Sequence, residues 1–394
     1  MKNKKISVYV AEIINSVAKF GDRALMSMAL KYDGIKLTQN TILVDQKAIS
    51  SSDKGIDAGL KNALDSAYKN VCNFHKTENS LIKRRWSTRS DGVICGQFFT
   101  PIESVGLYVP GGRFSYPSTV IMSAVPARIA GVSNIVIATP AKNITPALLY
   151  AAKLCGINKI YRVGGPAAIA ALALGTKTIS KVDFIAGPGN MFVSEAKRQL
   201  FGKVGIDSLA GPSEVVIVAD NKSNIDFIAA DICAQAEHDP EAKAYLITDS
   251  KNVIASVKKQ LASNVIKQTE FIFANNNDFA KLINNIAPEH LEIMTVKPEK
   301  LFAQVKNAGA VFVGSYTPTA FGDYFAGPSH VLPTGGCAKF SSGLSVLTFL
   351  KRSSFSSYSI KSAKKSAPLV AKIAQAEGLL EHAKSALLRG KNED

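Results

Sequence analysis

The sequence has no run of about 18 or more apolar residues, so it contains no candidate membrane-spanning helix. Its first residues are basic, but residues 6–20 have the pattern of an amphipathic helix and not the apolar core of a signal peptide. Cysteine is scarce as well, because the chain has 5, without CxxC spacing, which argues against a disulfide framework or a zinc ribbon. Scattered free thiols are typical of a reducing compartment. We therefore predict a cytoplasmic protein that does not enter a membrane.

Acidic residues are outnumbered, with 31 Asp and Glu against 47 Lys and Arg and a formal net charge of +16. Such a charge is compatible with a nucleic-acid surface. However, the lysines are spread thinly, the aromatic side chains lie in apolar runs, and the sequence has no recognised nucleic-acid motif. We therefore expect no nucleic-acid partner and interpret the charge as a contribution to solubility.

The composition is that of a globular protein, with 46% hydrophobic and 20% charged residues, and a length of 394 residues is typical of two or three domains. Residues 1 to about 75 predict mainly helices, and Arg84, Arg85, Trp86 and Arg89 fall in a predicted polar connector. Short apolar strands then alternate with helices, which indicates a mostly parallel sheet covered by helices. The predicted strands are residues 104–109, 134–139, 159–163 and 182–186, and the predicted helices are residues 118–130, 145–155 and 167–174.

A second run of the same kind follows. We therefore predict an α/β fold with two tandem Rossmann-like units, an N-terminal helical segment and a small C-terminal helical tail. The second set of strands is residues 214–219, 244–248, 271–273, 291–295 and 310–313, and its helices are residues 224–238, 251–262, 278–286 and 298–307. The predicted parts are residues 1–103, which pack with the second α/β unit, residues 104–212, residues 213–345 and residues 346–394.

Two later segments are unusual. Residues 314–336 form a Gly- and Pro-rich passage that is too long for a routine connection, and loops of this length are usually functional. The passage also leaves the carboxyl end of a predicted strand, where open α/β sheets bind ligands. Residues 351–366 are Ser- and Lys-rich and predict a linker or an exposed segment, and residues 367–389 predict a helical tail that is too small to form a core alone. The tail must dock on its own body or on a partner subunit.

The helix predicted before Pro240 carries two candidate metal ligands. Gln235 and His238 are three residues apart, so they lie on neighbouring lines of one helix face. Together they could form half of a metal site. Alternatively, His238 is a histidine hydrogen-bonded at a helix C-terminus, where its charge suits the helix dipole.

Four of the 5 histidines follow residue 230, whereas His75 lies in an early helix and is expected to be structural. Glu289 and His290 are adjacent at a predicted helix-to-strand turn. A carboxylate beside an imidazole supplies two proton-transfer groups of different pKa. Asp323 and His330 lie in the Gly-rich passage. These groups predict a site for proton transfer.

The C-terminal tail carries one more pair. Glu377 precedes His382 by five residues, so an unbroken helix would direct them about 140° apart. Gly378 between them can break the helix so that both face one site. Four N and O ligands, a set that suits zinc, would be supplied by Gln235, His238, Asp323 and His382.

Taken together, the motifs in the chain closely resemble those of the histidinol dehydrogenase family. They occur in order and at sensible spacing through most of the sequence, which makes the resemblance specific although each motif alone would be weak. The motifs are GLYVPGG (106–112), IAGPGN (185–190), AGPSE (210–214), AQAEHDP (234–240), APEH (287–290), GDY (322–324), HVLPT (330–334), FSSGLS (340–345) and AEG (376–378) with His382.

The resemblance implies a zinc-dependent enzyme that oxidises L-histidinol through an aldehyde to L-histidine, with two NAD molecules in succession. It implies His290 as general base and Glu289 as the group that activates water in the second oxidation. The zinc ligands would be Gln235, His238, Asp323 and His382, the last from the partner subunit of a homodimer. Substrate contacts would come from Ser213, His330 and Glu377 together with His290 and the zinc ligands, and NAD contacts from Tyr108 and Asn190. No GxGxxG motif follows a predicted strand, so NAD is implied by the resemblance alone.

The sequence departs from the family pattern at two places. Ala167, in GGPAA (164–168), replaces a glutamine that the family places against NAD, which removes an amide donor and acceptor. An N-terminal arm that usually supports the dimer is absent from this sequence. These departures concern the grip on NAD and the stability of the dimer, because the catalytic and metal positions all match.

Other functions remain open at this point. A sister enzyme on the same scaffold could oxidise another small alcohol, such as sulfopropanediol. A zinc hydrolase could use Glu289 with a metal-bound water and would not depend on nicotinamide. A nucleic-acid binder would show steeply salt-dependent retention on DNA or RNA. The chain could also be an enzyme that has lost activity, given Ala167.

Overall fold

The protein is described by a computed structural model that covers residues 2–111 and 115–391, so Gly112 of the GLYVPGG motif lies outside the described residues. The chain forms two compact units. The first contains residues 1–79 and 102–349, and the second contains residues 80–101 and 350–394. Within the described residues, no helix has both the length and the apolar character needed to cross a membrane.

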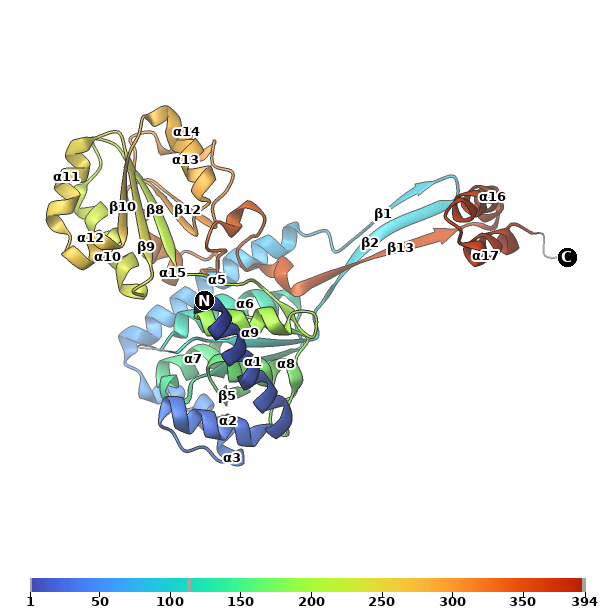
Figure 1. Ribbon diagram of the computed structural model, residues 1–394, viewed down its shortest axis with the longest axis horizontal. Helices are drawn as coiled ribbons and strands as arrows, with labels where there is room; N and C mark the ends of the chain where they lie inside the picture. Colours follow the sequence, from blue (N-terminus) through green and yellow to red (C-terminus); the bar gives the residue numbers. More distant parts are fainter. Residues whose placement is uncertain (1, 112–114, 392–394) are drawn as a thin grey trace. The chain divides into compact units, whose positions relative to one another are not determined.

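The first unit contains a five-stranded parallel sheet in the order β5-β4-β3-β6-β7. Its central strand, β3 (Ser104–Tyr108), is almost wholly buried because helices cover both faces of the sheet, as Figure 1 shows. The other strands are β4 (Asn134–Thr139), β5 (Ile160–Arg162), β6 (Phe184–Ala186) and β7 (Gly205–Ile206). The helices are α6 (Pro117–Ala130), α7 (Pro146–Leu154), α8 (Gly165–Leu174) and α9 (Met191–Leu200).

A second parallel sheet in the same unit repeats this order as β10-β9-β8-β11-β12. The repeated order confirms the predicted pair of tandem Rossmann-like units. The strands are β8 (Glu214–Ala219), β9 (Lys243–Thr248), β10 (Thr269–Phe273), β11 (His290–Ile293) and β12 (Ala310–Val313). The helices are α10 (Ile225–His238), α11 (Lys251–Gln260), α12 (Ser263–Lys267), α13 (Phe279–Ile286), α14 (Pro298–Phe302) and α15 (Thr319–Tyr324).

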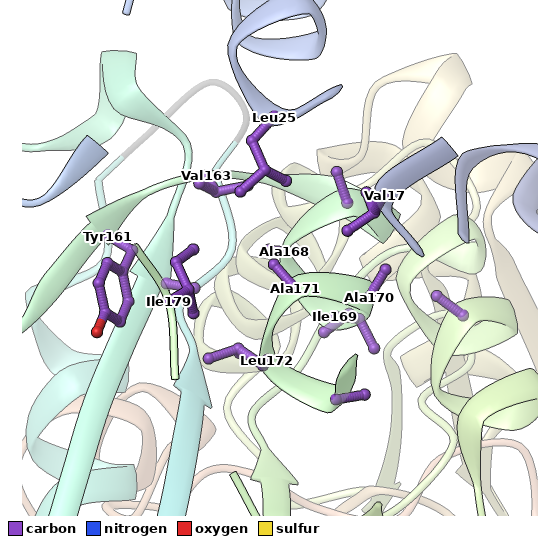
Figure 2. Packing of buried hydrophobic residues seen from close by; sticks show 14 of the residues in the cluster. Val17, Leu25, Tyr161, Val163, Ala168, Ile169, Ala170, Ala171, Leu172 and Ile179 are labelled. Atoms are coloured by element: carbon purple, nitrogen blue, oxygen red, sulfur yellow. The ribbon is translucent and has the colours of Figure 1, made fainter. Parts of the chain in front are cut away.

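The N-terminal helices pack mainly on the first sheet. Figure 2 shows Val17 and Leu25, from α1 (Lys2–Phe20) and α2 (Asp22–Met28), near the alanines of α8. Small residues on α8 allow this close approach. The packing of this segment against the second α/β unit stays a prediction. Helix α5 (Ala58–Leu81) reaches that unit at Asn70, which donates a hydrogen bond to the Phe325 carbonyl. Between α2 and α5 lie the π-helix Ala29–Asp33, α3 (Gln39–Ile42), α4 (Gln46–Ser50) and the 3-10 turn Ser52–Gly55.

The second unit is an antiparallel sheet followed by two helices. Its strands β1 (Arg85–Ser90), β2 (Val93–Pro101) and β13 (Leu350–Tyr358) run side by side in Figure 1. The predicted polar connector at Arg84–Arg89 was therefore wrong. For the segment from residue 351, the linker was wrong, but the alternative of an exposed segment is confirmed, because many side chains of β13 are exposed. Both segments are strands with many exposed side chains, so they lack the apolar alternation by which a strand is recognised.

The two C-terminal helices are α16 (Ile360–Ala376) and α17 (Leu380–Gly390). The predicted break between Glu377 and His382 is confirmed, because Gly378 has a φ of 78° between the two helices. They share a very small core of Ala371, Ala374 and Ala383. Large apolar side chains of the pair remain exposed in the single chain, among them Leu369, Ile373, Leu380 and Leu388.

Candidate active site

The candidate site lies where the carboxyl edge of the first sheet faces the amino edge of the second. Tyr108 ends β3, and the turn that carries Asn190 follows β6. Ser213 and Glu289 directly precede the neighbouring strands β8 and β11. These four residues, together with His330, line one cavity of 310 Å³. Open α/β sheets usually bind ligands at the carboxyl ends of their strands. The candidate site lies at that edge of the first sheet but at the opposite, amino edge of the second.

The long Gly-rich passage reaches this site by an unexpected route. It leaves the carboxyl end of β12, where we expected the ligand, but its Asp323 lies beside His290 at the opposite, amino end of β11. His330 then lines the same cavity. Sequence patterns locate a loop at a strand end, whereas the path of a loop back across a sheet depends on tertiary contacts.

Glu289 is held rigidly at the bottom of the cavity. Its Oε2 accepts hydrogen bonds from the Ser213 hydroxyl at 2.5 Å and from the Glu214 backbone N–H at 3.1 Å. Only 7% of the residue is exposed. Burial raises the pKa of this carboxyl, although the nearby His290 opposes the shift. A carboxylate with a raised pKa is well suited to accept a proton near neutral pH.

The turn before Glu289 is strained. Ala287 has a φ of 53°, which a residue with a Cβ rarely adopts, and it ends α13. Pro288 follows, so the chain changes direction sharply before β11 begins. Such backbone conformations persist where the surrounding structure requires them, and they concentrate at functional sites.

His290 lies between two carboxylates. Its Nδ1 is 3.7 Å from Glu289 Oε2, and its Nε2 is 3.6 Å from Asp323 Oδ1. Burial disfavours the charged ring, but the two carboxylates outweigh burial and raise the pKa of His290 to about 9. Neither ring nitrogen has a hydrogen-bond partner within the described residues, and the ring stacks on Phe312. Both nitrogens are therefore available for proton exchange with a bound molecule.

His330 has a different arrangement. Its Nδ1–H donates to the backbone carbonyl of Asp323 at 2.8 Å, since a carbonyl can only accept. Its Nε2 is then the acceptor for the Thr119 hydroxyl of α6 at 3.2 Å. Burial lowers the pKa of His330, although the charge of Asp323 opposes this shift. The predicted substrate contact of His330 stays a prediction, but the ring also links the first sheet unit to the second.

Three of the four predicted zinc ligands lie in the first unit. Gln235 is 4% exposed, and its side-chain nitrogen has no partner within the described residues. His238 ends α10 with an exposed side chain, as its place on the flank of the helix predicted. Asp323 would have its pKa raised by burial, but its contact with the His290 ring and the charges of His290, His330 and His238 keep the pKa below its usual value.

This donor set fits a metal ion that needs one more ligand. An orphaned buried amide is costly unless it meets a partner, and turning the amide presents its oxygen instead. Within the described residues, no group of three or more His, Cys, Asp and Glu is placed to hold a metal. His382, the fourth predicted ligand, belongs to α17 in the second unit. The assignment of zinc to these residues remains a prediction.

The two predicted NAD contacts also lie on the cavity wall. Tyr108 is 3% exposed, and its hydroxyl accepts a hydrogen bond from the Gly165 backbone N–H at 3.0 Å. Burial raises the pKa of Tyr108 to about 12, so the phenol is neutral. Asn190 caps α9 through Oδ1, which accepts from the N–H groups of Phe192 and Val193. The amide nitrogen of the Asn190 side chain is thereby directed away from the helix.

Sequence reasoning missed a buried ion pair behind this wall. Lys197 of α9 is 2% exposed and donates to Asp207 Oδ1 at 2.7 Å and to the Gly187 carbonyl at 2.6 Å. Asp207 Oδ2 accepts from the Gly187 N–H at 2.7 Å. A Cβ at Gly187 would collide with the carbonyl of Tyr108, so only glycine fits. The pair fixes the turn from Gly187 to Asn190.

Sequence reasoning also missed a second pair of titratable residues. Asp231 is on α10, the helix of Gln235 and His238, and Glu292 is on β11, the strand that begins at His290. Glu292 of β11 is 1% exposed and accepts hydrogen bonds at Oε1 from the Thr319 backbone N–H and hydroxyl at the start of α15. Burial, followed by the charge of Asp231 on α10, raises the pKa of Glu292 to about 7. With this pKa, a substantial fraction of the molecules has Glu292 protonated near neutral pH.

A family model described as histidinol dehydrogenase matches residues 1–390 of the chain. The chain is similar to the histidinol dehydrogenase of Thermosynechococcus vestitus, with 45% identity over 96% of this chain and 92% of that protein. It is also similar to that of Listeria monocytogenes, with 45% identity over 98% of this chain and 93% of that protein.

Among solved structures, the histidinol dehydrogenase from Elizabethkingia anophelis has a TM-score of 0.89 and 34% identity, over 97% of this chain and 91% of that chain. An acetylating aldehyde dehydrogenase from Geobacillus thermoglucosidasius has a TM-score of 0.51 at 14% identity, over 91% of this chain and 98% of that chain. The second likeness extends to the fold alone.

Proposed function

This chain belongs to the histidinol dehydrogenase family of oxidoreductases, and on that premise we propose that it oxidises L-histidinol to L-histidine in two NAD-dependent steps. The observation that carries the proposal is the placement of His290 between Glu289 and Asp323, beside the cavity that Tyr108 and Asn190 also line. In this arrangement, His290 is a proton acceptor, Glu289 is a carboxylate that can accept a proton in a second step, and Asp323 is a candidate metal ligand.

In the first oxidation, the neutral form of His290, which is the minor form near neutral pH because the pKa is about 9, accepts the hydroxyl proton of the alcohol at a ring nitrogen. The hydrogen on the carbon that bears the hydroxyl is lost as hydride, so that the C–O bond becomes the carbonyl of the aldehyde, and NAD, when bound, would supply the hydride acceptor. The flanking carboxylates stabilise the imidazolium that results. Asn190 and Tyr108 would hold the cofactor against the first sheet.

In the second oxidation, Glu289 accepts a proton from the water that adds to the aldehyde carbon. Its raised pKa suits this role, and Ser213 fixes the orientation of its carboxylate. His290, after it has released its first proton to solvent, accepts a proton from the resulting hydrate, and the hydrogen on the hydrate carbon is lost as a second hydride. The product is the carboxylic acid, and each oxidation removes two electrons.

Zinc would be held by Gln235, His238 and Asp323 of one chain and by His382 of the partner subunit. When bound, it would orient the amine and the imidazole of the substrate. His330 and Glu377 would also contact the substrate. The buried, unpaired amide of Gln235 supports this assignment.

A homodimer would explain the tail. The exposed apolar side chains of α16 and α17 need a protein surface to cover them, because the alanine core between the two helices is small. We assign that surface to a second copy of the chain, with Glu377 and His382 entering its site.

The test is the initial rate of NADH formation by zinc-loaded protein with L-histidinol. We expect activity that a chelator abolishes and zinc restores. A higher rate with sulfopropanediol than with L-histidinol would favour the sister enzyme instead. Hydrolysis of an ester or amide without nicotinamide, and no NADH from either alcohol, would favour the zinc hydrolase.

A further inference from the structure

Helix α15 carries Asp323, the candidate metal ligand that also lies beside His290. The helix has six residues, and none of them belongs to the buried core of the chain. Phe321 and Tyr324 are 57% and 58% exposed, so little apolar packing holds the helix in place. Helices this short are not stable by themselves in water. Other contacts must therefore set the position of Asp323.

The start of α15 is attached to strand β11 through Glu292. The Oε1 atom of Glu292 accepts hydrogen bonds from the Thr319 backbone N–H at 2.6 Å and from the Thr319 hydroxyl at 2.7 Å. This N–H is one of the donors that the first turn of a helix leaves without a partner inside the helix. The residue before it, Pro318, has no side-chain acceptor and makes no cap. A carboxyl group from a neighbouring strand thus supplies the cap that the local sequence lacks.

Glu292 is a rigid point of attachment. It is 1% exposed and lies within β11, where it pairs with Ile217 of β8 and Phe312 of β12. Phe312 also stacks on the His290 ring, and a Cβ on Gly322 of α15 would collide with the Phe312 ring. The helix therefore lies against the two strands that carry His290 and Phe312. Groups held by a sheet position their neighbours more precisely than groups on loops do.

Glu292 and the active site are joined through α15. Asp323 follows Thr319 by about one helical turn, so a shift at the start of the helix displaces it. At the other end, the Asp323 side chain is 3.6 Å from His290 Nε2, and its backbone carbonyl accepts a hydrogen bond from His330. Glu292 and His290 are two residues apart on β11, so their side chains lie on the same face of the sheet. One strand therefore holds both ends of the helix.

We propose that Glu292 is a positioning residue, which holds α15 so that the Asp323 side chain stays beside His290 and is available to a metal ion. The proposal rests on the proposed function, in which Asp323 is a zinc ligand, and adds a residue that touches neither metal nor substrate. Without the Glu292 acceptor, two donors of Thr319 lose their partner, and the start of the helix is no longer fixed. Groups that orient metal ligands typically change metal affinity by about 10- to 100-fold when they are removed.

The experiment measures the zinc affinity of the metal-free protein by competition with a chromophoric chelator. Glu292→Leu removes the acceptor at similar volume, and we expect it to bind zinc at least about tenfold more weakly than the wild type. Glu292→Gln keeps an oxygen that can accept both hydrogen bonds, so its zinc affinity should stay within about threefold of the wild type. Leu148→Ala creates a cavity at a fully buried position of α7, beside the first sheet. It is the control for a general loss of stability and should keep the wild-type zinc affinity.

A second pair of variants tests the same contact from the side of α15. Thr319→Val replaces the hydroxyl by a methyl group, whereas Thr319→Ser keeps the hydroxyl. We expect zinc binding to weaken by about threefold or more in Thr319→Val relative to Thr319→Ser. If Glu292→Leu does not fold, this pair decides the question. Equal zinc affinities of the two Thr319 variants, or wild-type affinity in folded Glu292→Leu, would overturn the role of Glu292.

A double variant tests whether Glu292 acts through Asp323. Asp323→Asn should weaken zinc binding by itself, and the addition of Glu292→Leu should then cost little more. Fully additive losses, or an equal loss of zinc affinity in Leu148→Ala, would overturn the proposal, because the effect would not pass through Asp323. A wild-type protein that binds no zinc would instead overturn the zinc site of the proposed function, and the role of Glu292 with it.

Discussion

At the scale of single residues, the site is an arrangement of proton acceptors with different surroundings. His290 has both ring nitrogens unpaired between two carboxylates, whereas both nitrogens of His330 are engaged. Glu289 accepts two hydrogen bonds at one oxygen. Two histidines in one site thus have different capacities for proton transfer, and the difference comes from their neighbours.

His290→Asn should lower the rate of NADH formation by at least about a hundredfold, because it removes the proposed general base. Zinc content should not change, since His290 is outside the proposed ligand set. Steady-state rates and metal analysis of the purified variant measure both. His75→Asn, which removes a buried histidine that contacts Glu78 away from the cavity, is the matched control. A loss of less than about a hundredfold in the rate of His290→Asn would show that His290 is not the general base.

Glu292 should make the protein less stable as pH rises. Its pKa is about 7 in the folded chain against an ordinary value of 4.5, so the folded state binds the proton more tightly than the unfolded state does. This group therefore lowers the free energy of unfolding as pH rises from about 4.5 to 7, by up to about 3 kcal/mol.

Urea unfolding of Glu292→Gln at several pH values in that window measures the effect. We expect the variant to lose much of the fall in stability that the wild type shows. Glu299→Gln, on the exposed side of α14, should retain the wild-type slope. Identical pH slopes for the wild type and Glu292→Gln would show that Glu292 is ionised normally in the folded protein.

At the scale of elements, the wall of the site depends on the turn between β6 and α9. Lys197 and Asp207 fix the backbone of Gly187 from both its N–H and its carbonyl. Removing one member of a buried ion pair leaves the other charge uncompensated, and this costs more than removing both.

Lys197→Met should therefore destabilise the protein by about 3 kcal/mol or more. The double variant with Asp207→Asn should recover part of that loss, because no lone charge remains buried. Denaturant unfolding of the two single variants and the double variant completes the cycle. Additive losses in the double variant would mean that the two side chains do not interact.

The elements also show what could be predicted from the sequence. The strands of the two parallel sheets, except the two-residue β7, were predicted because they are short apolar runs between recognisable helices. Strands β1 and β13 were missed because exposed polar strands have no apolar pattern, and β13 pairs with β2 across about 250 residues. Strand β2 was missed although its sequence is partly apolar. Helix α9 was not predicted either.

The candidate site was predicted unevenly. The proximity of Glu289 and His290 follows from adjacency in the sequence, but their functions and the NAD contacts came from the family motifs. The pairs Lys197–Asp207 and Asp231–Glu292 could not be predicted, since charged residues in a sequence are normally expected on the surface. Their burial became evident only once the helices and strands were assembled.

At the scale of the whole molecule, we propose that the site is built from two chains. Gln235, His238 and Asp323 come from the first unit, and His382 comes from the second. Suppose that the tail crosses to a partner and that one chain is altered only in its body and the other only in its tail. A mixed dimer of these two chains then contains one site in which both parts are intact.

We therefore predict that inactive His290→Asn and inactive His382→Asn chains regain activity when they are co-expressed. A mixed dimer would contain one complete site, from the His382→Asn body and the His290→Asn tail. Random assembly gives mixed dimers in about half of the molecules, and so about a quarter of the wild-type activity. Each variant expressed alone is the control. No recovery in verified mixed dimers would place His382 in the site of its own chain.

The most direct test of the central claim is the end-point yield of NADH from a limiting amount of L-histidinol with zinc-loaded protein and excess NAD. The account predicts two NADH for each L-histidinol, with L-histidine as the product. One NADH with accumulation of the aldehyde would contradict the role of Glu289 in a second oxidation. No NADH at all would contradict the proposed reaction.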